Sequence, residues 1–159
     1  PKMRELIKLP NPLLRQKSKP VERIDSKIKA LASDMVEFMH LHRADKSRPI
    51  GLSACQLGEL VRVIAFRQNS LSIDKDDIQV VINPELVYQK SNYLVHESCL
   101  SIPGKVFTLQ RAKIVKIRGF TLDNVVRSFR AHDLLAQVFQ HELDHIDGAL
   151  IDQLEEEKS

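Results

Sequence analysis

The chain has 159 residues, of which 43% are hydrophobic and 28% charged, fractions typical of soluble globular proteins. This length suits one ordinary domain, expected to span residues 1–159. The formal net charge of +3 is too small and too scattered along the sequence to indicate a nucleic-acid-binding stripe. No apolar run approaches the ~20 residues of a membrane span, and the opening PKMRE does not resemble a secretory signal. A reducing compartment is therefore expected.

The first half of the chain predicts a helix followed by strands. Apolar residues recur every three or four positions over residues 26–42, which predicts an amphipathic helix with Asp25 as its N-cap. Residues 43–49 contain no large aliphatic or aromatic side chain and are expected to form an exposed loop. Several later runs are rich in β-branched residues, and we expect strands there: 61–66, 78–82, 93–97, 112–117 and 125–130.

Helical periodicity returns at Asp133, and Gly148 is placed to close this last helix. No helical pattern separates the predicted strands, so parallel βαβ units are not expected. The predicted fold class is α+β, with mixed or antiparallel β-sheets packed around a C-terminal metal-binding helix and with a long N-terminal helix. The acidic end of the chain, from Asp152 onward, is expected to fray.

A metal ion is predicted on the last helix because of its HELDH motif, His141 to His145. Histidines four residues apart lie one above the other on a helix, so both imidazoles can reach one ion. Glu142 lies on the same side, displaced around the helix, where a general base would stand. Such a match on a solvated face would occur by chance in roughly one chain per hundred of this length. However, Phe139 and Ile146 turn this face inward, where the motif would be costly to bury without an ion.

A zinc or iron site needs a third protein ligand and an open position. In one metalloprotease pattern the third histidine would fall at Ile151, and little sequence follows His145 to supply a later ligand. The third ligand is therefore expected upstream of the helix. Five residues remain open, the last less favoured because it lies at the start of the same helix: Cys99, Cys55, His96, Glu97 and His132.

Three segments, in order along the chain, resemble the motifs of the peptide deformylase family. The family pattern Gly-x-Gly-x-Ala-Ala-x-Gln is similar to PIGLSACQ at 49–56, and Glu-Gly-Cys-Leu-Ser is similar to ESCLS at 97–101. The pattern Gln-His-Glu-x-x-His is matched in full by QHELDH at 140–145. The resemblance covers almost the whole chain. The first two segments depart from the pattern at three positions: Pro49, Ser53 and Ser98.

The resemblance implies a metal-dependent hydrolase acting on a linear amide. Such an enzyme removes the formyl group from the N-terminal formyl-methionine of nascent peptides and releases formate. One divalent ion per chain is implied, Fe²⁺ or Zn²⁺ with Ni²⁺ or Co²⁺ as substitutes, held by Cys99, His141 and His145. Glu142 would carry the proton. Gln56 and the backbone N–H of Leu100 would stabilise the oxyanion.

The resemblance also implies substrate contacts and partners. Ile50 and Gly51 would pair with the peptide backbone like an added strand, and Leu134 and Val138 would line an apolar pocket for the methionine side chain. The implied partners are N-formyl-methionyl peptides and, transiently at most, the ribosome, because the longer C-terminal helix of many bacterial members does not follow Ile151. No membrane and no direct nucleic-acid contact are expected. The expected location is the cytoplasm or an organelle.

Three further interpretations concern the same region. The departures from the family pattern raise the alternative of a degenerate relative, which keeps the metal site and binds peptide N-termini without efficient turnover. The two cysteines, Cys55 and Cys99, could instead be inert buried thiols, or a pair that oxidation joins as a disulfide. Arg111 is placed to bond to Glu97 and brace the segment around Cys99.

Overall fold

A computed structural model of the chain describes residues 4–155. The first three residues of the sequence and residues 156–159, part of the end expected to fray, lie outside that range. No helix in the described range is long and apolar enough to cross a membrane. The elements follow one another in this order: 3-10 helix η1 (Pro12–Arg15), α1 (Ser26–Leu41), β1 (Gly51–Ser53), η2 (Ala54–Leu57), β2 (Val63–Arg67), η3 (Lys75–Asp77), β3 (Ile78–Cys99), β4 (Ile102–Phe120), β5 (Val126–His132), α2 (Asp133–Ile146) and α3 (Ile151–Leu154).

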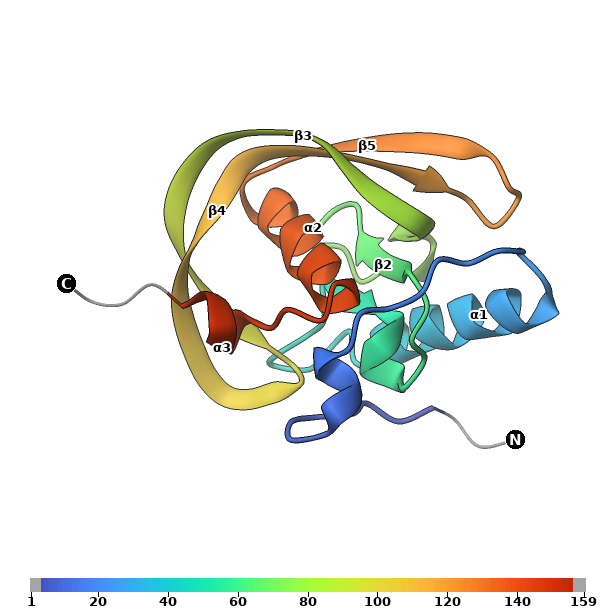
Figure 1. The fold of residues 1–159 in the computed structure, drawn as a ribbon, viewed down its shortest axis with the longest axis horizontal. Coiled ribbons are helices and arrows are strands. Elements are labelled where there is room, and N and C mark those ends of the chain that lie inside the picture. The colour runs from blue at the N-terminus through green and yellow to red at the C-terminus, as the bar shows by residue number, and fades with distance from the viewer. Residues whose placement is uncertain (1–3, 156–159) are drawn as a thin grey trace.

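The five strands form one sheet in the order β1-β2-β3-β4-β5, and every neighbouring pair is antiparallel. The α+β architecture is therefore confirmed with an antiparallel rather than a mixed sheet. A parallel pairing occurs only as an isolated bridge between Lys19 and Val61 among the described residues. The long strands β3 and β4 curve with β5 into an arch over α2 (Figure 1).

Two strand predictions need correction because β3 is one strand from Ile78 to Cys99, not separate runs at 78–82 and 93–97. Its middle part is exposed, so polar side chains break the apolar pattern that predicts a strand. Bulges near Glu85 and Tyr88 also interrupt the register. The predicted run at 112–117 is likewise the centre of the longer β4. The short strand β1 was not predicted.

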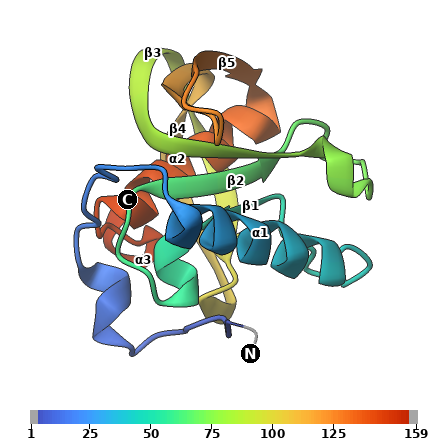
Figure 2. The same ribbon diagram turned by 90° about the vertical axis from the view of Figure 1, so that its right-hand side faces the viewer.

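The two main helices pack on opposite faces of β2, whose residues alternate between two cores. Helix α1 begins after Asp25, whose side chain accepts a hydrogen bond from the Ile28 N–H at 3.1 Å, and it packs on one face of β1, β2 and the start of β3. Helix α2 packs on the other face and also contacts β4 and β5. Figure 2 shows α1 running along β1 and β2, well away from β5.

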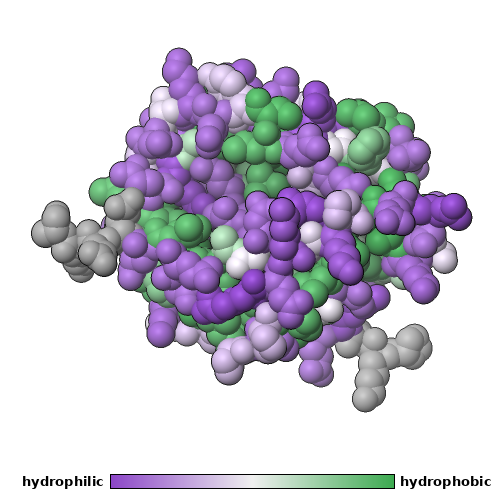
Figure 3. Space-filling view, viewed as in Figure 1, coloured by the Kyte–Doolittle hydropathy of each residue, from purple (hydrophilic) through white to green (hydrophobic). Residues whose placement is uncertain are grey.

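The segments that follow the helices match the sequence-based expectations except at Pro49 and at the start of the C-terminal end. Gly148 has φ +77° and donates its N–H to the carbonyl of His145, which closes the end of α2. Residues 43–49 form turns and bends without a regular element, but Pro49 is buried rather than exposed. Residues 152–154 belong to α3, so the frayed end cannot begin at Asp152. The face of the molecule seen in Figure 3 is mostly hydrophilic, with scattered hydrophobic patches.

Candidate metal centre and cleft

The end of β3 and the second half of α2 bring three metal-ligating side chains together. The Cys99 Sγ atom lies 3.2 Å from His145 Nε2, which lies 3.2 Å from His141 Nε2. All three ligand atoms lie within 4.8 Å of one another. Cys99 and His145 are buried, and the His141 side chain is only 11% exposed.

Of the other residues left open as a third ligand, none joins this cluster. His96 is exposed on β3, where its ring contacts the Thr108 hydroxyl. His132 is the N-cap of α2, at the other end of that helix. The Cys55 Sγ atom lies 3.6 Å from the backbone carbonyl oxygen of His145 and is not one of the clustered ligand atoms. Glu97 contacts His141 through Nδ1, the ring nitrogen that does not belong to the cluster.

Glu97 fixes the orientation of His141. Its Oε2 atom lies 2.6 Å from His141 Nδ1, so this carboxylate favours a proton on Nδ1, and Nε2 on the other side of the ring faces His145. A thiolate sulfur with two imidazole nitrogens is a donor set that suits Zn²⁺ and Fe²⁺. The residues present therefore fit one divalent ion.

The predicted contact between Arg111 and Glu97 is confirmed. The Arg111 guanidinium donates to both Glu97 oxygens, at 3.1 and 2.6 Å, and also to Asp144 on α2. Burial alone would raise the pKa of Glu97, but the hydrogen bonds from His141 and Arg111 outweigh it and lower that pKa to about 2. Glu97 is therefore a carboxylate at neutral pH, and its contacts tie β3 and β4 to α2.

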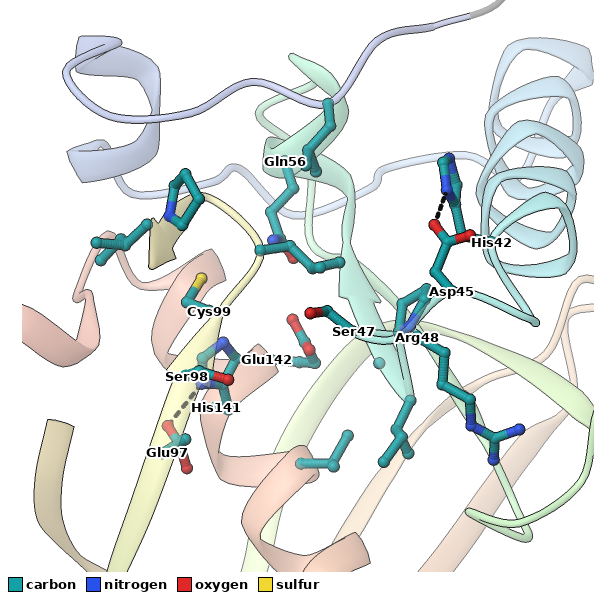
Figure 4. Close-up of a pocket in the computed structure, with 18 of the residues that line it drawn as sticks. His42, Asp45, Ser47, Arg48, Gln56, Glu97, Ser98, Cys99, His141 and Glu142 are labelled. Carbon is teal, nitrogen blue, oxygen red and sulfur yellow. Dashed lines mark hydrogen bonds and ion pairs between the residues drawn. The ribbon is translucent and has the colours of Figure 1, made fainter. Parts of the chain in front are cut away.

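Glu142 lies beside the three ligands with one carboxylate oxygen free. Its side chain is buried, and Oε1 has no hydrogen-bond partner among the described residues. Burial and the nearby charge of Glu97 raise the pKa of Glu142 to about 7. A carboxyl group with that pKa can both accept and donate a proton near neutral pH. Figure 4 shows Glu142 with Cys99 and His141 on one side of it and Ser47 on the other.

Gln56 is held by hydrogen bonds to both ends of its side-chain amide. Its Oε1 accepts from the N–H and the hydroxyl of Ser53, at 3.0 and 3.1 Å, and its Nε2 donates to the Ser101 hydroxyl at 3.2 Å. A primary amide has two N–H donors, so one remains for a ligand in the cleft that Gln56 lines. Ser53, one of the departures from the family pattern, thus adds a hydrogen bond that alanine could not make.

The other two departures are also compatible with the site. Ser98 is an exposed residue of β3 whose φ does not lie in the left-handed region, so its backbone does not require glycine. Pro49 is buried next to Ile50, whose carbonyl accepts the Arg67 N–H at 2.9 Å.

The two cysteines are free thiols, and burial raises the pKa of Cys55 to about 11.

A cleft of about 550 Å³ opens beside the three ligands. Of the ten site residues predicted from sequence, only His145 does not line this cleft. The nine that line it are Ile50, Gly51, Gln56, Cys99, Leu100, Leu134, Val138, His141 and Glu142. Strand β1 borders the cleft and is the first strand in the sheet order, so one of its edges has no partner strand among residues 4–155. Sequence reasoning missed other lining residues, among them Phe38, His42 and Arg48. Phe38 belongs to an apolar stripe, and nothing in the sequence marks the other two.

Comparison with known proteins agrees with this geometry. A profile described as polypeptide deformylase matches residues 3–159. The chain is 40% identical over 150 residues to the peptide deformylase of Dictyoglomus thermophilum, covering 94% of this chain and 90% of that protein. Against the peptide deformylase of Bartonella tribocorum it is 38% identical over 153 residues, covering 93% and 82%.

Solved structures give the same result. The crystal structure of a peptide deformylase from Legionella pneumophila is 32% identical with a TM-score of 0.85, covering 96% of this chain and 86% of that one. The peptide deformylase of Thermotoga maritima is 27% identical with a TM-score of 0.85, covering 99% and 100%. This chain therefore belongs to the peptide deformylase family.

Proposed function

We propose that this chain is a metal-dependent hydrolase that removes the formyl group from N-terminal formyl-methionine and releases formate, with residues 1–159 acting as one domain. One observation carries the proposal. Cys99, His141 and His145 lie together at a cleft that also contains the free carboxylate oxygen of Glu142. Family membership supports the same activity.

Members of this family depend on a metal, and the three ligands here fit one divalent ion. We propose Fe²⁺ or Zn²⁺, both of which accept thiolate and imidazole ligands, with Ni²⁺ or Co²⁺ as substitutes. When bound with an open position, such an ion would act as a Lewis acid that lowers the pKa of water to about 7.

The proposed role of Glu142 is to carry a proton during hydrolysis of the formyl amide. As a carboxylate it accepts a proton from the attacking water, and as a carboxylic acid it donates that proton to the departing amine. Its pKa of about 7 suits both steps at neutral pH. Bond cleavage then leaves formate and a peptide with a free amino terminus.

Two N–H donors are placed to stabilise the charge that develops on the formyl oxygen. Gln56 keeps one N–H for the cleft while Ser53 and Ser101 fix its amide plane. Leu100, next to Cys99, also lines the cleft, and we assign the second N–H to its backbone. Removing one such preorganised donor from an enzyme site typically costs about 2.7–4 kcal/mol of transition-state stabilisation.

The peptide is proposed to bind along the free edge of β1. The backbone of Ile50 and Gly51 would pair with the residues after the formyl group, as in other cases of strand addition. Leu134 and Val138, one turn apart on α2, line the same cleft and would contact the methionine side chain. Specificity then comes from the apolar wall that these two side chains form in the cleft.

The alternative of a binding protein without turnover gains no support from the comparisons or the site. Binding alone would need neither the free oxygen of Glu142 nor the fixed amide of Gln56. The departures at Ser53 and Ser98 leave the geometry intact. We further propose that the enzyme works in the cytoplasm or an organelle and that any contact with the ribosome is transient.

The direct test is formate release from formyl-Met-Ala-Ser by freshly prepared protein loaded with Fe²⁺ or Zn²⁺. The matched control is Glu142→Ala, whose metal content should equal that of the parent because Glu142 is not a ligand. We expect the parent to release formate at least 100-fold faster than the variant, since proton transfer by a positioned side chain contributes about 10²–10⁴-fold. Equal rates for the two proteins would refute the proposal.

A further inference from the structure

One face of the sheet is only partly covered by helices. Helix α1 covers this face over β1, β2 and the start of β3, while α2 lies on the opposite face beneath the arch of β3, β4 and β5. In Figure 1 no described element lies over the outer side of that arch. The outer face of the arch is therefore open to solvent and lies away from the cleft.

The strand register gathers positive charge on this outer face. Lys116 on β4 is directly opposite Arg130 on β5, and Arg118 follows two positions along β4 on the same side. Lys90 adds a fourth cation from β3. It pairs with Ile114, which lies two positions before Lys116 on β4 and so on the same face. All four side chains are exposed. Since neighbouring strands are about 4.8 Å apart, long basic side chains on adjacent strands reach one common ligand.

These cations lack acidic partners. None of the four forms an ion pair among residues 4–155, and Glu85, opposite Arg118, remains beyond ion-pair distance. Lys116 and Arg130 lie directly opposite each other on neighbouring strands. Two like charges in that arrangement destabilise the sheet. A bound polyanion would relieve that repulsion.

An aromatic ring lies among the cations. Tyr88 on β3 pairs with Lys116, so Tyr88, Lys116 and Arg130 form one row across three strands. The Arg130 guanidinium carbon lies 5.8 Å from the centre of the Tyr88 ring, which is 43% exposed. Proteins that bind single-stranded nucleic acids combine such a stacking ring for a base with cations for the phosphates.

We propose that the outer face of β3, β4 and β5, defined by Tyr88, Lys90, Lys116, Arg118 and Arg130, binds single-stranded RNA. The cations contact phosphates and Tyr88 stacks on a base. The choice of RNA as the polyanion rests on the proposed function, because formylated N-termini are made on RNA. The proposal replaces the expectation of no nucleic-acid contact, since these residues lie far apart in the sequence and meet only through strand register.

Other polyanions fit the same face less well. An acidic peptide would use the cations but not the exposed face of Tyr88. An anionic membrane would need apolar side chains beside the charges, whereas Phe120 and Val126 lie together at one end of the face. RNA uses both the charges and the ring.

The test is fluorescence anisotropy of a short labelled oligouridylate with the full-length, metal-loaded chain, between about 50 and 200 mM salt. The test variant is Lys116→Gln/Arg118→Gln/Arg130→Gln. The matched control is Arg23→Gln/Lys27→Gln/Lys29→Gln, which removes the same charge from exposed residues near the start of α1. Each lost phosphate contact lowers the slope of log K against log salt by about 0.7 for a single strand.

We expect the test variant to bind at least tenfold more weakly, with the salt slope reduced by about 2, while the control matches the parent. Tyr88→Ala should also weaken binding and Tyr88→Phe should restore it. Formate release from formyl-Met-Ala-Ser should be unchanged in all variants, so this proposal and the proposed function can fail separately. Equal weakening in the control, no RNA binding by the parent at 50 mM salt, or tighter binding to polyglutamate or phosphatidylserine vesicles would overturn the proposal.

Discussion

Gly51 lies where β1 passes the side of α2, and the position of the Glu142 carboxylate depends on its lack of a side chain. A Cβ atom at this position would lie 2.6 Å from Glu142 Oε2 and 2.6 Å from Val138 Cγ1. Heavy atoms do not approach so closely, so either α2 or the Glu142 side chain would have to move. A shift of about 1 Å in a catalytic group can lower a rate roughly 100-fold.

We therefore expect Gly51→Ala to lower kcat for formyl-Met-Ala-Ser by about 10- to 100-fold without changing metal content. Gly104→Ala is the control, because Gly104 also lines the cleft but a Cβ there would meet no atom within 4 Å. The control should lose only stability, since its φ is +79°. Steady-state kinetics and metal analysis of both variants test this, and an unchanged kcat in Gly51→Ala would contradict the geometry.

At this scale the sequence predicts some roles better than others. The positions of His141, Glu142 and His145 follow from helical spacing alone, because all three lie on one helix. Cys99 could be chosen from five candidates only through the family resemblance, since its position depends on tertiary contacts. The hydrogen bonds of Ser53 to Gln56 could not be predicted, because they require the turn of η2.

The elements around the metal centre are joined by one buried network. Arg111 on β4 bonds to Glu97 on β3 and to Asp144 on α2, and the Arg111 and Glu97 side chains are almost fully buried. Gln140 adds a second link, because its amide bonds to both the N–H and the carbonyl of Ala112 on β4. These bonds fix the position of α2 relative to β3, the strand that carries Cys99.

Removing one member of the network should be strongly destabilising. Arg111→Met leaves Glu97 buried without its cation, and breaking a buried ion pair in this way costs about 3–5 kcal/mol. Urea unfolding would measure the loss, and Arg127→Met, at an exposed site without an ion pair, is the control. The double variant Arg111→Met/Glu97→Gln should recover part of the loss. A change below about 1 kcal/mol in Arg111→Met would contradict the account.

Element boundaries were the hardest feature to predict. Helices α1 and α2 repeat apolar residues along one buried stripe, so their extents follow from the pattern. The middle of β3 is exposed and largely polar, so the alternation of apolar residues that predicts a strand is absent there. Strand β1 is too short, with only three residues, to produce any periodicity.

At the scale of the whole molecule, the candidate metal ligands come from the end of β3 and from α2, so a bound ion would link the sheet to the helix in its arch (Figures 1 and 4). An ion that binds only the folded chain stabilises it by about 2.7 kcal/mol when free ion exceeds Kd 100-fold. For a chain of this length, each kcal/mol raises Tm by about 2–4 °C.

Chelation should therefore lower the Tm of the parent protein by several degrees, and added Zn²⁺ should restore it. Cys99→Ala, which lacks one ligand, should show a Tm close to that of the chelated parent and little response to chelator. Differential scanning calorimetry compares the two proteins. If the parent Tm does not respond to chelator, or if both proteins respond equally, the ion is not bound at this centre.

The central claim is that one thiolate and two imidazoles from distant segments hold one ion. X-ray absorption at the zinc edge of the Zn²⁺-loaded chain measures those ligands directly. We predict one sulfur neighbour at about 2.3 Å and two imidazole nitrogens at about 2.0–2.1 Å, with the sulfur lost in Cys99→Ala and kept in Cys55→Ala. A spectrum without a sulfur neighbour, or a sulfur that survives in Cys99→Ala, would contradict the claim.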